Sequence, residues 1–321
     1  MISFFEIPSH LLSGTRRLLQ AELAKRSWQA ETPLFSSPHL FLTRPDGVRL
    51  HVFGAVPPTA SFAASHLAGN KFYTHMCVEG HGIKQPETMI YDPDKPEEAK
   101  EFLKKHGKIV VKPIDASHGH GITIGITEYA DLTPAIERAI AVCFTNPRAL
   151  IQECLSPDLQ DTRVLVIDYK VIGAINRVPA RVTGDGKHTV AELIPIENNT
   201  LRGEPYKAPL AIIPLETALN YLGDKANTIP SKDEKFRVMP LANYGKGGEL
   251  IDVTDELTAE MRDQAERVAK LIDLPVAGID FLGDYFIELN ACPSLQIHDE
   301  PAVGKPRGAV KAYVDYLEKI S

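Results

Sequence analysis

The chain has 321 residues, 44% of them apolar and 24% charged, so it is long enough to form two or three lobes with a buried core. Its formal net charge of −7 argues against nonspecific nucleic-acid binding, which depends on lysine and arginine neutralising phosphates. The four cysteines form no C-x-x-C pair, so neither a zinc nor a redox motif is indicated. We expect a cytoplasmic protein without a signal peptide or membrane helix.

Taken in chain order, the hydrophobic pattern predicts helices mixed with short strands. The first half predicts a helix over 11–28, a hairpin over 39–54, a helix over 69–80, a strand near 87–91 and a helix over 93–107. The middle predicts a hairpin over 108–126, a helix over 132–144, a strand over 149–155, two strands within 163–182 and a turn and helix over 183–194. The last part predicts a loop-rich segment over 197–245, a helix over 256–274, a hairpin over 276–290 and a helix over 309–320.

The hairpin at 108–126 carries Lys112 in an apolar strand, directly before a segment with two glycines at 115–121. Glycine permits backbone dihedrals that point successive N–H groups at an anion, and the lysine would meet the same phosphates. The alternative is an ordinary hairpin with Lys112 on an edge strand, which the following Pro113 favours. Lys71, at the start of an earlier helix, would by itself be taken as a surface lysine.

The C-terminal hairpin allows a test of strand register, because successive side chains point to opposite faces. A two-residue turn would place Asp280 opposite Ile287. A three-residue loop would place it opposite Glu288, on the same face as Asn290. The second register also pairs Phe281 with Ile287 and Ile279 with Leu289, and it leaves Phe286 and Leu282 on the polar face. We therefore expect the three-residue loop and an oxygen-rich face suited to Mg²⁺ and nucleotide phosphates; the alternative is a solvent-exposed polar face of an amphipathic hairpin.

Together, these motifs resemble the ATP-grasp superfamily, in particular the ATP-grasp module of cyanophycin synthetase and of the bifunctional glutathione synthetases. The resemblance extends from about residue 70 to residue 307. It rests on V-V-K-P-I-D-A-S-H-G-H-G-I-T, D-T-R-V-L-V-I-D, I-N-R-V-P-A-R-V-T-G-D-G-K-H-T-V, L-A-N-Y-G-K-G-G-E-L-I-D-V-T-D-E, and G-I-D-F through E-L-N-A-C-P-S to G-K-P-R.

The resemblance implies an α+β, ATP-grasp fold in which two lobes clamp ATP. We expect a short N-terminal region at 1–66, a first lobe at 67–155 and a second lobe at 156–321. By position, Lys71 and Lys112 would contact the phosphates of ATP. The loop that closes over these phosphates would contain Ser117, His118, Gly119 and Gly121. The adenine would contact Glu153, Cys154 and Leu155, and the ribose would lie near Asp161. The implied ligands of Mg²⁺, or of Mn²⁺, are Asp280, Glu288 and Asn290, and the implied catalytic cations are Arg177 and Lys112.

The family's reaction joins a carboxylate to an amine through an acyl phosphate, so the expected substrates are ATP and an amino acid or short peptide. Relatives imply a dimer or tetramer. Candidate substrate residues are Arg163, His188, Asn199, Arg202 and Ser294, with His75 and His298 as further possibilities. Two alternatives stay open on the same fold: a small-molecule kinase, and a nucleotide-binding regulatory module without catalysis.

Overall fold

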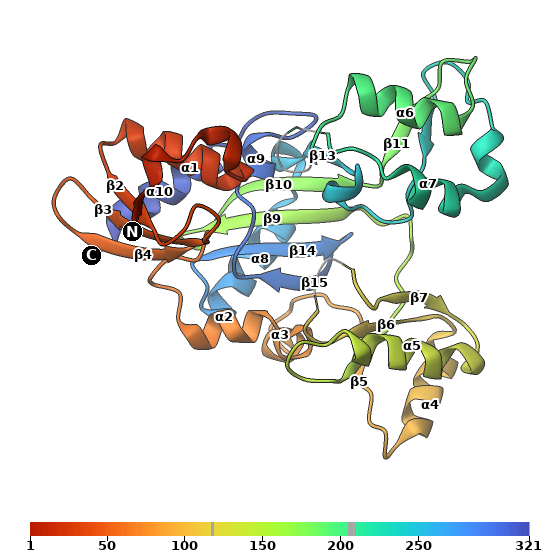
Figure 1. Cartoon of the computed structure of the whole chain (residues 1–321). Helices are drawn as coiled ribbons and strands as arrows, with labels where there is room; N and C mark the ends of the chain where they lie inside the picture. Colours follow the sequence, from red (N-terminus) through yellow and green to blue (C-terminus); the bar gives the residue numbers. More distant parts are fainter. Residues whose placement is uncertain (117–118, 205–207, 209, 321) are drawn as a thin grey trace.

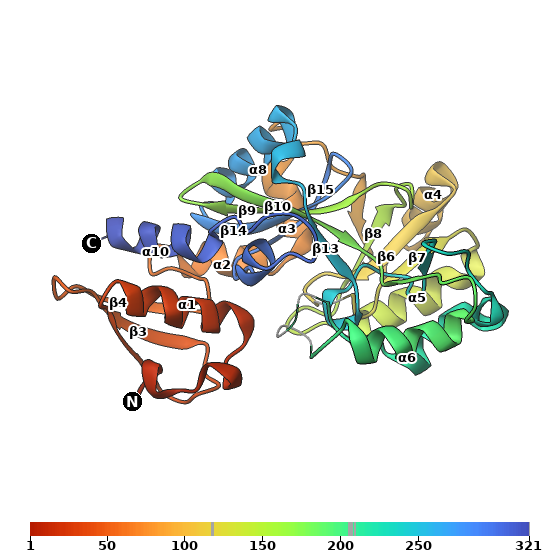
Figure 2. The ribbon, with the colours of Figure 1, turned by 90° about the horizontal axis from the view of Figure 1, so that it is seen from above.

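The computed structural model of the protein describes residues 1–116, 119–204, 208 and 210–320. Helices alternate with antiparallel strands, so the α+β prediction is confirmed. Three sheets carry the architecture: an N-terminal sheet of four strands, a five-stranded sheet and a second four-stranded sheet (Figure 1). The two four-stranded sheets lie at opposite ends of the five-stranded sheet (Figure 2). Among the helices of these residues, none combines the length and the hydropathy of a membrane span.

The N-terminal sheet has the order β1-β2-β3-β4, and helix α1 packs against it. Its elements are β1 (Ile2–Ser3), α1 (Gly14–Lys25), β2 (Gln29–Thr32), β3 (His39–Thr43) and β4 (Arg49–Phe53). The closing helix α10 (Ala309–Lys319) packs beside α1. Tyr313 and Leu317 of α10 share one core with Leu165 and Val276 of the five-stranded sheet. The N-terminal region is therefore anchored on one face of that sheet.

The second four-stranded sheet has the order β5-β8-β6-β7. Its elements are β5 (Thr88–Ile90), α4 (Pro96–His106), β6 (Ile109–Pro113), β7 (Thr123–Ile126), α5 (Tyr129–Ala141) and β8 (Ala149–Glu153). Helix α4 ends at Gly107, whose φ of 68° is the left-handed conformation that glycine adopts readily. Strand β6 lies between β8 and β7. The alternative of Lys112 on an edge strand is therefore wrong.

The five-stranded sheet has the order β13-β10-β9-β14-β15. Its strands are β9 (Asp161–Ile167), β10 (Lys170–Val178), β13 (Glu249–Asp252), β14 (Val276–Leu282) and β15 (Tyr285–Asn290). Helices α2 (Phe62–Ala68), α3 (Lys71–Val78) and α8 (Ala259–Ile272) cover its other face. The hydroxyl of Thr258 accepts from Met261 N at 3.1 Å and caps α8. Helix α3 therefore packs on this sheet, although it precedes the first lobe's strands in the chain.

The segment at 197–245 is more ordered than the loop-rich prediction, which is wrong in this respect. It contains the helix α7 (Leu215–Leu222) and the strand β12 (Lys235–Arg237), which pairs with β11 (Arg181–Thr183). Helix α6 (Val190–Thr200) begins at a capping box formed by Thr189 and Glu192. Short helical turns elsewhere are α9 (Gln296–Asp299) and the 3-10 turns Phe4–Glu6, Ser9–Leu11, Gly223–Asn227, Tyr244–Lys246 and Thr254–Glu256.

The C-terminal hairpin combines features of both registers considered from the sequence. Asp280 lies opposite Glu288, as predicted, but Phe281 lies opposite Phe286 and Leu282 lies opposite Tyr285. The connection is therefore a two-residue turn, and the predicted three-residue loop is wrong. A β-bulge at Ile287 supplies the extra residue. The bulge also moves Phe286 into the apolar core instead of the polar face.

Candidate functional site

Lys112 is buried on β6, and its hydrogen-bond partner is a neutral side chain. Its Nζ donates to Oε1 of Gln152 on β8 at 2.8 Å, and Nε2 of Gln152 donates to the hydroxyl of Thr88 at 2.7 Å. Burial lowers the pKa of Lys112 to about 8, while Glu288 opposes this effect and Lys71 adds to it. Within the described residues, no carboxylate forms a direct ion pair with this cation. An anionic ligand would therefore stabilise it.

Lys71 connects the two lobes. It is the first residue of α3, and its backbone N–H donates to Ile114 O at 2.9 Å. Its Nζ donates to Ala116 O at 2.7 Å and lies 3.3 Å from Oε2 of Glu288. Its side chain is only 13% exposed, so the surface-lysine alternative is wrong. The residue joins the start of the glycine-containing loop to the C-terminal hairpin.

Paired charges lie at one end of the five-stranded sheet. Arg163 on β9 lies opposite Asp280 on β14 and donates to both carboxylate oxygens, through Nε and, at 2.8 Å, through Nη2. Arg177 on β10 donates to Asp161 at 2.5 and 3.0 Å and lies 3.1 Å from Asp280. Burial alone would raise the pKa of Asp280, but Arg163 and Arg177 outweigh it and hold this pKa below its usual range. Asp280 is therefore an ionised carboxylate at neutral pH.

The fit of a divalent cation can be judged from the oxygen donors on the hairpin. Asp280 and Glu288 are directly opposed, and Asn290 lies opposite Gly278 on the same face. The amide Nδ2 of Asn290 is buried and has no hydrogen-bond partner among the described residues. Two carboxylates and an amide oxygen suit Mg²⁺ if ligand oxygens complete the coordination. In the described part of the chain, no group of three or more His, Cys, Asp or Glu residues could hold a metal.

The residues expected at the adenine lie where β8 ends. The backbone N–H of Glu153 donates to Glu87 O at 2.9 Å, and one carboxylate oxygen of Glu153 accepts from Glu87 N at 3.2 Å. The backbone N–H of Cys154 donates to Lys108 O at 3.2 Å. By contrast, the N–H of Leu155 donates to no other described residue. It is a backbone donor that an adenine ring could use.

Two of the four loop residues expected at the phosphates can be examined. Gly119 and Gly121 have φ angles of 76° and 71°, in the left-handed region that favours glycine. A Cβ at Gly121 would lie 2.4 Å from Cγ2 of Val142, so this position admits no side chain without rearrangement. Ser117 and His118 lie outside the described residues. The backbone conformation of Gly119 and Gly121, and the close packing at Gly121, therefore explain why these residues are glycines, whether or not the loop contacts phosphate.

The candidate substrate residues are dispersed. Arg202 is fully engaged by the protein, because its guanidinium donates to Glu197 and to the carbonyls of Arg181, Ala211 and Gly247. His188 is exposed and contacts Asp185 at 2.6 Å. Asn199 is exposed on α6. Of the five main candidates, Arg163 and Ser294 lie near the hairpin, so we do not carry His188, Asn199 and Arg202 into the proposed site.

The sequence indicated His75 only as a possible substrate residue and did not indicate Gln85 and Gln152, which form a polar chain with it. His75 on α3 lies 3.0 Å from the carbonyl oxygen of Ile287, the bulged residue, and 2.7 Å from Oε1 of Gln85. Its Nε2 also lies 3.4 Å from Nε2 of Gln152, which contacts Lys112. Gln152 stands in an apolar strand just as Lys112 does, and that pattern could have identified it.

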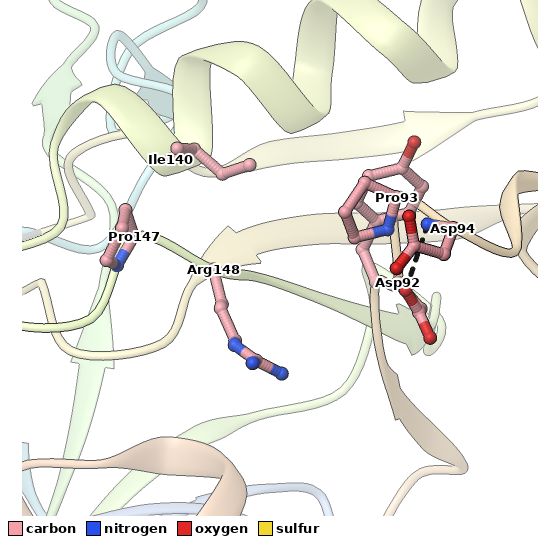
Figure 3. A pocket seen from close by; sticks show the side chains of 7 residues that line it. Asp92, Pro93, Asp94, Ile140, Pro147 and Arg148 are labelled. Atoms are coloured by element: carbon pink, nitrogen blue, oxygen red, sulfur yellow. Dashed lines mark hydrogen bonds between the residues drawn. The ribbon is translucent and has the colours of Figure 1, made fainter.

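A pocket of about 390 Å³ lies away from these residues (Figure 3). It is lined by Tyr91, Asp92, Pro93, Asp94, Ile140, Pro147 and Arg148. Arg148 immediately precedes β8, whereas the residues expected at the adenine follow the other end of this strand. None of the predicted site residues lines the pocket. The pocket is therefore separate from the predicted nucleotide site.

Comparisons with known proteins connect the chain with larger enzymes. Residues 76–191 match the prokaryotic glutathione synthetase ATP-grasp domain family. The chain is 35% identical over 268 residues to a cyanophycin synthetase from a Nostoc species. The matched region covers 78% of this chain and 29% of that enzyme. The chain is also 31% identical over 297 residues to the glutathione biosynthesis bifunctional protein of Clostridium perfringens. That match covers 86% of this chain and 38% of that protein.

A solved structure has the same fold. The bifunctional glutathione synthetase from Pasteurella multocida matches with a TM-score of 0.70 at 23% identity, over 99% of this chain and 44% of that chain. The present chain spans only 29% and 38% of the length of the two curated relatives. The resemblance expected from the motifs is confirmed at the level of fold and relationship. The hairpin acids lie beyond the family match at 76–191, so their role depends on the geometry described above.

Proposed function

Because this chain has the ATP-grasp fold, we propose that it is an ATP-dependent ligase that joins a carboxylate to an amine. The observation that carries this proposal is the meeting of Lys71 with Glu288, opposite Asp280, at the point where the glycine-containing loop begins. Cations from one side and acids from the other would enclose a metal-bound triphosphate between the lobes. The cyanophycin and glutathione enzymes among its relatives support an amino acid or short peptide as substrate.

The proposed metal site consists of Asp280, Glu288 and Asn290. Bound Mg²⁺, or Mn²⁺ on the same oxygen ligands, would offset the negative charge of the phosphates. Arg163 would position Asp280, because it holds both carboxylate oxygens from the neighbouring strand. Lys71 would release Glu288 on nucleotide binding and turn its ammonium group to phosphate oxygen.

The remaining charged groups would stabilise the transferring phosphoryl group and then the acyl intermediate. Lys112 would gain an anionic partner that it lacks in the free protein. Arg177 would offset charge on the γ-phosphate and on the tetrahedral intermediate. In the second step, the amine nitrogen attacks the acyl carbon, inorganic phosphate leaves and the nitrogen loses a proton. The loop at 115–121 would exclude water, which would otherwise hydrolyse the acyl phosphate.

The test is ATP-dependent phosphate release in a screen of acid and amine pairs, with mass analysis of the products. A ligase releases phosphate only when both an acid and an amine are present, and it forms an amide. A stable phosphorylated product that accumulates without an amine would overturn the ligase proposal in favour of a kinase. Absence of any turnover with intact ATP binding would favour a regulatory module. A cytoplasmic location and a dimeric or tetrameric assembly stay predictions from the sequence.

A further inference from the structure

An acid begins the glycine-containing loop at 115–121, directly after the strand that carries Lys112. The carboxylate of Asp115 accepts four hydrogen bonds from three successive residues of the connection between α5 and β8. The donors are Phe144 N at 3.0 Å, Thr145 N at 2.8 Å, the Thr145 hydroxyl at 2.7 Å and Asn146 N at 3.1 Å. Asp115 therefore ties the start of the loop to this connection.

These donors keep Asp115 ionised at neutral pH. Burial alone would raise its pKa, but the hydrogen bonds from Thr145, Phe144 and Asn146 outweigh burial and lower this pKa to about 2. Hydrogen bonds to a carboxylate are stronger than those between neutral groups. Three of the four donors are backbone N–H groups, so the acid fixes the position of one backbone segment against another.

The backbone on each side of Asp115 holds Lys71. The carbonyl oxygen of Ile114 accepts from Lys71 N at 2.9 Å, and that of Ala116 accepts from Lys71 Nζ at 2.7 Å. The same Nζ lies 3.3 Å from Oε2 of Glu288, which belongs to the proposed metal site. A displacement of Asp115 would therefore move both carbonyl oxygens that place the Lys71 side chain.

The far end of the loop packs on the same part of the fold. A Cβ at Gly121 would overlap Cγ2 of Val142 and would lie 3.2 Å from Arg138 O, so its backbone lies directly on the end of α5. Between the two ends, a Cβ at Gly119 would lie 3.7 Å from Cδ1 of Leu241, in the segment between β12 and β13. The described loop residues are thus held at both ends near α5, and Gly119 reaches a segment more than a hundred residues away in the chain.

We propose that Asp115 is a positioning residue for phosphate binding. It fixes the start of the glycine-containing loop on the connection between α5 and β8, so that the loop backbone and the Lys71 ammonium group meet the β- and γ-phosphates of ATP. Its carboxylate is occupied by protein donors and would repel phosphate, so it acts through the backbone and not by contact. This inference rests on the nucleotide site of the proposed function, and it adds a residue on which phosphate affinity depends.

The experiment compares wild type with Asp115→Ala, which removes the acceptor of all four hydrogen bonds. The matched control is Asp185→Ala, because Asp185 likewise accepts from two backbone N–H groups, those of Lys187 and His188, in the turn between β11 and α6. A further variant, Thr145→Val, removes only the hydroxyl donor. Calorimetry measures the binding of ATP and of AMP, each with Mg²⁺, and thermal unfolding of the free proteins measures stability.

Asp115→Ala should raise the Kd for ATP by about 10-fold or more, because the groups that contact the phosphates lose their position. The Kd for AMP, which lacks the β- and γ-phosphates, should stay within about twofold of wild type. Thr145→Val should raise the Kd for ATP by about two- to threefold and leave the Kd for AMP unchanged. Asp185→Ala should lower the melting temperature about as much as Asp115→Ala does and keep the affinity for ATP.

An unchanged Kd for ATP in Asp115→Ala, or equal losses of ATP and AMP affinity, would overturn the positioning role and leave the ligase proposal intact. If Asp115→Ala does not fold, the same comparison of ATP with AMP in Thr145→Val decides. Selective loss of ATP affinity in Asp115→Ala, together with a wild type that forms no amide in the substrate screen, would support Asp115 and overturn the ligase. A wild-type protein that does not bind ATP would overturn both.

Discussion

The two lobes that face the proposed site hold their buried charges in opposite ways. On the five-stranded sheet, Asp280 is paired with Arg163 and lies near Arg177, so each charge has a partner before any ligand arrives. On the sheet formed by β5, β8, β6 and β7, Lys112 is equally buried, but its hydrogen-bond partner is the neutral Gln152. The first arrangement holds its side chains in position by itself. The second is complete only when an anion binds.

The pKa shifts express this difference as free energy. Burial opposes ionisation of Asp280, yet its two arginine neighbours hold its pKa below the usual range. Burial lowers the pKa of Lys112 from 10.5 to about 8, which corresponds to about 3 kcal/mol against the charged form. Strongly shifted groups of this kind are typical of functional sites. On the proposed function, the second lobe would supply a preformed site, and nucleotide binding would give Lys112 of the first lobe an anionic partner.

The largest expected effect is that of Glu288→Gln. This substitution keeps the shape of the side chain and removes a charge that we assign to the metal, so turnover should fall by at least about 100-fold. The melting temperature should change little, because the partner Lys71 can reach other acceptors. Phosphate release at saturating ATP and Mg²⁺ measures the effect. The control is Glu266→Gln, which alters an acid paired with Lys170 on the surface and should keep full activity. A fully active Glu288→Gln would show that Glu288 is not part of the site.

Arg163→Met tests the paired side of the comparison. It leaves Asp280 buried with one cation fewer, so the free energy of unfolding at pH 7 should fall by about 3 kcal/mol. Asp280 has a lowered pKa in the folded state, so its contribution to stability is present above its unfolded pKa and is lost as the pH falls. The difference between variant and wild type should therefore shrink toward pH 3.

Denaturant unfolding at several pH values measures this effect of Arg163. The control is Lys311→Met, which breaks an exposed pair with Asp315 and should cost less than about 1 kcal/mol. Equal stabilities of Arg163→Met and wild type at neutral pH would contradict the account of a mutually stabilised network.

Lys112→Met tests the unpaired side. Loss of the buried charge should offset the unsatisfied oxygen of Gln152, so the free protein should keep its stability or gain about 1 kcal/mol. Affinity for ATP should nevertheless fall by about 10- to 100-fold, because a phosphate partner is lost. Calorimetry with ATP and thermal unfolding of the free protein separate the two effects. The control is Lys105→Met, which removes an exposed partner of Glu87 and should change neither ATP affinity nor stability. A destabilised Lys112→Met with unchanged ATP affinity would contradict the assignment of Lys112 to the phosphates.

Much of this arrangement could be predicted from alternation and order along the chain. The opposition of Asp280 and Glu288 followed from pairing apolar residues on the other face of the hairpin. The type of turn could not be predicted in this way. A two-residue turn with a bulge at Ile287 places Asp280 opposite Glu288, and so does a three-residue loop without a bulge. Periodicity alone cannot distinguish them, and the burial of Phe286 depends on which one forms.

Contacts between distant segments were beyond local patterns. Nothing near Arg163 in the sequence indicates that it holds Asp280, which is 117 residues away. The pairing of β11 with β12 across the expected loop at 197–245 has the same character, because both strands are only three residues long. The contact of the first helix with residues near the end of the chain is the extreme case, since the hydroxyl of Thr15 accepts from Leu295 N and Gln296 N.

The smallest expected effect is a pH dependence of nucleotide affinity that belongs to Lys112 alone. In the free protein, this lysine is charged below a pKa of about 8 and neutral above it, and the proposed phosphate contact would require the charged form. ATP binding should therefore weaken by about 5- to 10-fold between pH 7.5 and pH 9 in wild type and stay nearly constant in Lys112→Met. Over the same range the free wild-type protein should gain stability, because a lysine with a pKa near 10.5 in the unfolded chain then holds more protons than the folded one. Parallel slopes for the two proteins in either measurement would show that Lys112 is not the titrating group, and the contrast between the lobes would then need another cause.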